Sequence, residues 1–101
     1  MNGKLSNNVL PNNRAFKEMK AQKQLLETLK EMHSGELFAV LKLQDIANNL
    51  SRKSGEKYSA LKISSMIRRL FGDHVIEMHA RAAINIDSLN RNLERFARFK
   101  V

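Results

Sequence analysis

The chain has 101 residues, of which 43% are hydrophobic, a net charge of +8 at pH 7 and no cysteine. This length and apolar content predict one domain with a real hydrophobic core, and they exclude a disordered chain. The absence of cysteine excludes a disulfide framework and any thiolate metal site, and it is typical of a reducing compartment.

The hydropathy pattern predicts a soluble, cytoplasmic protein. No apolar run approaches the roughly 20 residues that cross a membrane. The N-terminal sequence MNGKLSNNVLPNN is polar and lacks the apolar centre of a signal peptide. We therefore expect no membrane partner.

Positive charge is concentrated in the middle of the chain. Residues 51–70 contain six basic residues and one acidic residue, a net charge of +5. The six are Arg52, Lys53, Lys57, Lys62, Arg68 and Arg69. Such clustering favours a polyanionic partner, and nucleic acid is the commonest one. The alternative is a basic surface that only keeps the protein in solution.

Residues 1–12 are expected to form a flexible N-terminal arm. A helix should follow from Asn13 to Ser34, because apolar residues recur there at three- and four-residue steps and Gly35 tolerates a left-handed conformation. The apolar stripe of this helix is wide, which leaves two interpretations open. Either the intramolecular core uses all of it, or it also covers a second subunit.

The next segments predict a strand, a helix and a turn. Phe38–Leu41 contains aromatic and β-branched residues, which favour a strand. Gln44–Leu50 is expected to be helical. Ser51–Tyr58 contains Gly55 and no apolar residue before its last position, so that it predicts the turn.

The segment SALKISSMIRRLFG, Ser59 to Gly72, predicts an amphipathic helix. Ser59 is the expected N-cap and Gly72 the expected end. At 100° per residue, one side gathers the apolar residues Ala60, Ile63, Met66, Ile67, Leu70 and Phe71. The other side carries Lys62, Ser65, Arg68 and Arg69, with Leu61 at its edge.

Two short strands are expected next, at Val75–Met78 and Ala83–Ile86, joined by a tight loop over residues 79–82. The loop would place Arg81 and, at lower pH, a charged His79 at its tip. It contains no glycine, so that it lacks the strongest hairpin signal. A last helix should begin after Asp87 or Ser88, which are good N-caps.

No catalytic, cofactor or metal site is predicted, and we expect the protein not to be an enzyme. The three histidines, His33, His74 and His79, have no ligand spacing and no cysteine partner. The four glycines are isolated, which excludes a glycine-rich phosphate loop, and no serine is placed beside a base.

The order helix, strand, helix, turn, helix, strand, loop, strand, helix resembles a winged helix-turn-helix DNA-binding domain. The segments that carry the resemblance are LKLQDIANNL for the second helix, SALKISSMIRRLF for the recognition helix and VIEMHARAAINID for the wing. The resemblance implies a mainly helical α+β fold over residues 13–101 that binds double-stranded DNA. The predicted turn is longer and the wing shorter than the family pattern.

The resemblance also implies that the recognition helix enters a major groove. Lys62, Ser65 and Arg69 would then reach base edges, and Arg81 would enter a minor groove. The full implied set is Arg52, Lys53, Lys57, Ser59, Leu61, Lys62, Ser65, Arg68, Arg69, His79 and Arg81. Its other basic members would hold phosphates. The alternative for Arg68 and Arg69 is an ion pair with an acid such as Asp73 or Glu77.

More narrowly, the size, composition and domain order are similar to TcpK-like accessory DNA-binding proteins of conjugative plasmids. That resemblance implies a homodimer bound at a transfer origin beside a relaxase or another DNA-processing protein. A transcriptional regulator of a plasmid or phage is an alternative. A different class of function is a protein-interaction module on the same scaffold. RNA binding ranks lower because few aromatic residues are available for base stacking.

Overall fold

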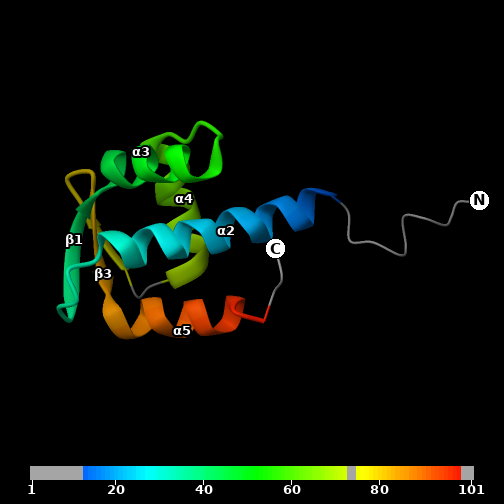
Figure 1. Ribbon diagram of the computed structural model, residues 1–101. Coiled ribbons are helices and arrows are strands. Elements are labelled where there is room, and N and C mark those ends of the chain that lie inside the picture. The colour runs from blue at the N-terminus through cyan, green and yellow to red at the C-terminus, as the bar shows by residue number, and fades with distance from the viewer. Residues whose placement is uncertain (1–12, 73–74, 99–101) are drawn as a thin grey trace, which may run out of the picture.

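The computed structural model describes residues 13–72 and 75–98. These residues form four helices and a three-stranded antiparallel sheet, which confirms a mainly helical α+β fold (Figure 1). In chain order the elements are α2 (Asn13–Met32), β1 (Phe38–Lys42), α3 (Leu43–Ser54), α4 (Ala60–Phe71), β2 (Val75–Met78), β3 (Arg81–Asn85) and α5 (Ile86–Phe96). The expected arm, Asp73 and His74 lie outside the described residues.

Helix α2 is the central element of the fold. Figure 1 shows α2 crossing the middle of the molecule, with α3 along one side of it and α5 along the other. The sheet lies at the C-terminal end of α2, and the first turns of α2 project beyond the other helices.

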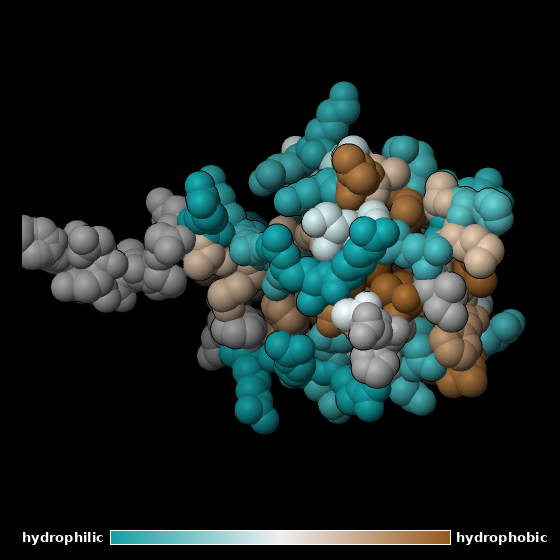
Figure 2. All heavy atoms as spheres, turned by 180° about the vertical axis from the view of Figure 1, so that it is seen from behind, coloured by the Kyte–Doolittle hydropathy of each residue, from teal (hydrophilic) through white to brown (hydrophobic). Residues whose placement is uncertain are grey.

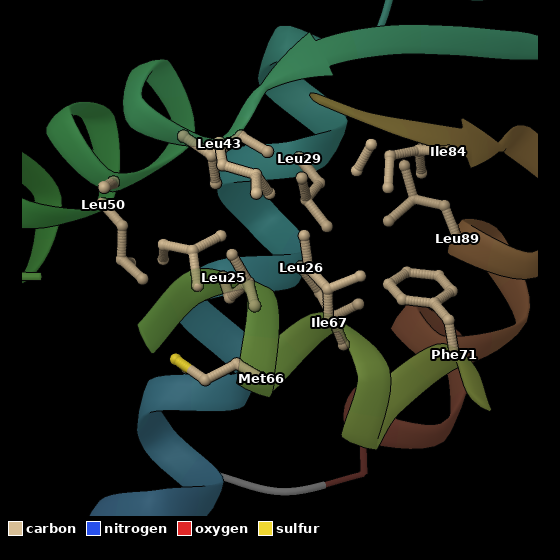
Figure 3. Packing of buried hydrophobic residues seen from close by; sticks show 14 of the residues in the cluster. Leu25, Leu26, Leu29, Leu43, Leu50, Met66, Ile67, Phe71, Ile84 and Leu89 are labelled. Atoms are coloured by element: carbon tan, nitrogen blue, oxygen red, sulfur yellow. The ribbon is translucent and has the colours of Figure 1, made fainter. Parts of the chain in front are cut away.

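The hydrophobic core is formed by buried side chains from α2, α3, α4, β3 and α5. Leu25, Leu26 and Leu29 of α2 are fully buried and point toward the inner face of α4 (Figure 3). Burial of each such side chain contributes at most about 1.5–3 kcal/mol relative to exposure. The apolar stripe of α2 is thus used mainly within the chain, although Phe16 near its start is 44% exposed.

Helix α2 ends at Met32, two residues before the expected end at Ser34. His33 ties this end to the sheet: its Nδ1 accepts a hydrogen bond from the backbone N–H of Gly35, so that Nε2 donates to the carbonyl of Ile84 at 2.9 Å. Gly35 has φ +91°, the left-handed conformation expected of it.

Helix α3 is longer than expected: it ends at Ser54 and not at Leu50. The polar residues after Leu50 continue the helix on its solvent-exposed side, where no apolar residue is needed. The basic residues of the last turn, Arg52 and Lys53, interact favourably with the partial negative charge at the C-terminal end of the helix. Gly55 ends it at φ +78°, with its N–H on the carbonyl of Ser51. The turn is therefore residues 55–59, and the prediction of a turn from Ser51 was wrong.

The strands lie in the order β1–β3–β2. The loop between β2 and β3 has only two residues, His79 and Ala80, at φ +54° and +62°. Two positive φ values define the tight turn whose twist suits a hairpin. β3 therefore begins at Arg81 and ends at Asn85, which corrects the expected strand at Ala83–Ile86 and the four-residue loop.

Helix α5 begins at Ile86, immediately after β3, and not after Asp87 or Ser88. Asn85 is the N-cap, because its backbone is still extended and its side chain accepts from the N–H of Ser88 at 3.0 Å. In the parts of the chain that the structure describes, no helix has both the length and the apolar character needed to cross a bilayer.

Candidate nucleic-acid interface

Helix α4 has the bounds that its sequence predicts. Ser59 Oγ accepts a hydrogen bond from the backbone N–H of Lys62 at 3.1 Å, and the N–H of Gly72 bonds to the carbonyl of Arg68. The face of α4 that packs on the core is buried, as expected, through Ile63, Met66, Ile67 and Phe71. The opposite face is thereby oriented outward.

The outward face of α4 is cationic and polar. Lys62 and Ser65 are exposed, and Leu61 beside them is 82% exposed. The helix contains no acidic residue. Figure 2, seen from behind so that α4 lies nearer the viewer than α2, shows mostly hydrophilic atoms with scattered hydrophobic ones. This face can offer hydrogen-bond donors and one apolar contact to a negatively charged partner.

Arg68 is held by an acid of the sheet. Its Nε atom donates to Glu77 Oε2 at 3.2 Å, and Glu77 Oε1 accepts from the buried Ser64 hydroxyl at 2.6 Å. Only 16% of the Glu77 side chain is exposed. The ion-pair alternative to a phosphate contact is thus the arrangement found for Arg68, with Glu77 as the acid. Arg68 joins α4 to β2.

Arg69 also pairs with an acid, but in an exposed setting. Its guanidinium contacts the carboxylate of Glu18 on α2. The two side chains are 62% and 45% exposed, respectively. An ion pair in such an environment is screened and contributes little to stability. Arg69 can therefore exchange its partner at low cost.

Lys53 in the last turn of α3 is paired across to α2. Its Nζ lies 2.7 Å from Glu31 Oε2, and this hydrogen bond raises the pKa of Lys53, while its partial burial acts in the opposite direction. The neighbouring Arg52 is exposed and donates to the side-chain oxygen of Asn49. Of these two cations, Arg52 is the one that no acid holds among the described residues.

The turn before α4 carries Lys57 and Tyr58. Lys57 is exposed, whereas Tyr58 is half-buried and donates its backbone N–H to Ser51 Oγ at 2.9 Å. Burial raises the pKa of the Tyr58 phenol, and the nearby Glu56 carboxylate raises it further. The phenol is consequently held neutral beside the cationic face of α4.

The hairpin tip is tied to the start of α3. The carbonyl of Ala80 accepts from the N–H of Leu43 at 3.0 Å, and Arg81 lies in register between Met78 on β2 and Lys42 on β1. His79 and Arg81 are exposed as expected. Lys42, which the sequence did not single out, is therefore paired with Arg81 in the sheet.

A groove separates the first turns of α2 from α4. Its volume is about 580 Å³. Arg14 and Lys17 line one wall, and Lys57, Lys62 and Arg69 line the other. Arg14 and Lys17 were not among the site residues predicted from the sequence, although their three-residue spacing on a helix places them on one face.

Comparison with known proteins adds no identity: no family model, curated protein or solved structure matches this chain. In residues 13–72 and 75–98, no group of three or more His, Cys, Asp or Glu side chains is placed to hold a metal ion.

Proposed function

We propose that this protein binds double-stranded DNA through the outward face of α4. The observation that carries the proposal is the composition of that face: Lys62 and Ser65 are exposed beside Leu61, and α4 has no acidic residue. Lysine and serine can contact base edges or phosphates, and an apolar side chain can contact the methyl group of thymine.

In this proposal α3, residues 55–59 and α4 act as a helix-turn-helix, and the β2–β3 hairpin acts as the wing. The support is the length of the turn, which is five residues and thus close to the three or four of the compact motif. The hairpin is short, so that Arg81 would contact the DNA backbone or the rim of a groove close to the body of the protein.

The test is the binding of random duplex DNA at several salt concentrations. With on the order of five phosphate contacts, the logarithm of the association constant should fall against the logarithm of salt with a slope of about −4 to −5. Lys62→Ala should weaken binding, whereas Glu36→Gln, which changes the charge at an exposed loop, should not. A flat salt response would overturn the proposal.

We also propose that the protein is a homodimer that pairs through the open edge of β1. The carbonyl of Leu37 accepts from the N–H of Ile86, and the N–H of Leu43 donates to the carbonyl of Ala80, so that these two bonds flank β3. Alternate residues between Leu37 and Leu43 therefore turn their backbone groups to the other, open edge of β1. Phe38 and Val40 are among these, and their side chains are exposed. Antiparallel self-pairing about Val40 would satisfy those groups. Light scattering should give a dimer mass that Val40→Lys reduces to a monomer mass; a monomer in the unaltered protein refutes it.

A narrower role follows from the resemblance to plasmid transfer accessory proteins. We propose binding at a transfer origin, with a relaxase or another DNA-processing protein as the partner. The support is the basic composition and the order of elements. Equal affinity for an origin region and for scrambled DNA of the same length would remove this role and leave general DNA binding in place.

A further inference from the structure

The groove between α2 and α4 combines a cavity with an excess of positive charge. It has a volume of about 580 Å³, and its lining includes five basic residues and two acidic ones. The basic residues come from three separate segments: the first turns of α2, the turn before α4, and α4 itself. A linear anion that runs along the groove would therefore meet cations on both walls.

The α2 wall is formed by one face of the helix. Arg14, Lys17 and Glu18 are spaced by three and four residues, which places them on the same side. Lys20 is exposed on the same helix but does not line the groove. Helix α2 thus carries one lysine that lines the groove, Lys17, and one that does not, Lys20.

Glu18 occupies the position that an external anion would take. Its carboxylate contacts the guanidinium of Arg69 across the groove, and both side chains are largely exposed. A phosphate diester can accept two parallel hydrogen bonds from an arginine, as a carboxylate does. By contrast, Glu77 is mostly buried and also holds Ser64, so that its pair with Arg68 is not open to such exchange.

We propose that this groove holds one sugar-phosphate backbone of the bound DNA, and that the backbone replaces Glu18 as the partner of Arg69. Arg14 and Lys17 then contact phosphates from the α2 side, and Lys57 contacts them from the turn. The inference rests on the proposed function, because it concerns the same nucleic acid. It extends the contact surface from α4 to the projecting turns of α2.

The first test compares Lys17→Ala with Lys20→Ala, which remove one charge each from the same helix. Each phosphate contact that is lost should change the log–log salt slope by about 0.9. We expect Lys17→Ala to make the slope shallower by about that amount and to lower the affinity for random duplex DNA. Lys20→Ala should leave the slope unchanged. Equal effects of the two variants on DNA binding would overturn the groove assignment. This same result is expected if the groove holds an acidic protein segment and not DNA.

The second test removes the competing carboxylate. Glu18→Gln should increase the affinity for random duplex DNA by about two- to fivefold, the range expected when an exposed ion pair no longer has to be broken. Glu36→Gln, with the same change of charge in a loop at the other end of α2, should have a smaller effect. If Glu18→Gln binds no more tightly than Glu36→Gln, the inference fails while DNA binding stands. If the unaltered protein does not bind DNA, the proposed function itself fails.

Discussion

Arg68 and Glu77 join helix α4 to strand β2, with 3.2 Å between Arg68 Nε and Glu77 Oε2. The other carboxylate oxygen of Glu77 accepts from Ser64, a buried residue on α4. Because a single carboxylate holds two side chains of α4, it fixes the orientation of the helix against the sheet. The neighbouring Arg69, which is paired with the exposed Glu18, is free of this structural role.

Glu77→Ala should lower the free energy of unfolding by about 1–3 kcal/mol, because it leaves the buried Ser64 hydroxyl without its acceptor. Urea denaturation measures this quantity. Glu36→Ala is the control at an exposed loop position and should change it by less than about 0.5 kcal/mol. An equal, small effect of both variants would show that Glu77 does not fix α4.

Lys62 and Arg69 should differ in their effect on DNA sequence preference. Both residues line the groove, but Lys62 is exposed on the outward face in the first turn of α4, whereas Arg69 in the last turn contacts Glu18 on the opposite wall of the groove that we assign to the sugar-phosphate backbone. Lys62→Ala should therefore narrow the affinity gap between a selected site and random duplex DNA, whereas Arg69→Ala should weaken both by similar factors. Fluorescence anisotropy with both duplexes measures the two ratios. A narrowed gap for Arg69→Ala would instead place that residue at base edges.

Local sequence patterns were sufficient to predict the element order and the ends of α4. Ser59 and Gly72 each have a conformational property that marks a helix end, and the structure uses both. The last turn of α3 was missed because its residues are polar, and periodicity reports only the buried face of a helix. The hairpin turn was only partly predicted, since Ala80 gives no sign in the sequence that its φ is positive.

The site was predicted less completely than the fold. The faces of α4 follow from a 100° rotation per residue, and they are correct. The pairing of Arg69 with Glu18 links residues that are 51 positions apart, and no local pattern contains that information. Arg68 and Lys53 are each held by an acid on another element, whereas Lys57 and Lys62 line the groove. Only the three-dimensional structure shows this difference among the basic residues.

Ala80→Gly should stabilise the protein. Ala80 has φ +62°, a left-handed conformation that costs a residue with a Cβ roughly 1 kcal/mol. Glycine adopts it freely, although it loses more backbone entropy on folding. The expected gain in the free energy of unfolding is about 0.5 kcal/mol. The same substitution at Ala83, inside β3, should have the opposite sign, and destabilisation by both variants would contradict the turn conformation.

The protein should lose stability as the pH rises above about 10, and Tyr58 should contribute to that loss. Burial and Glu56 raise the pKa of its phenol above the ordinary value of 10.0 in the folded state. A raised pKa contributes stability that is fully present below the unfolded value and disappears as the pH passes through the folded value. Lys53, whose pKa is raised by Glu31, acts in the same direction.

Absorbance of the phenolate measures this shift directly, because the chain has a single tyrosine. The titration midpoint should lie above 10.0 in the folded protein and return toward that value in concentrated urea. Tyr58→Phe is the matched control: its stability should fall less steeply above about pH 10, by the share that the phenol contributes. Identical midpoints with and without urea would mean that the Tyr58 phenol is as well solvated in the folded state as in the unfolded chain.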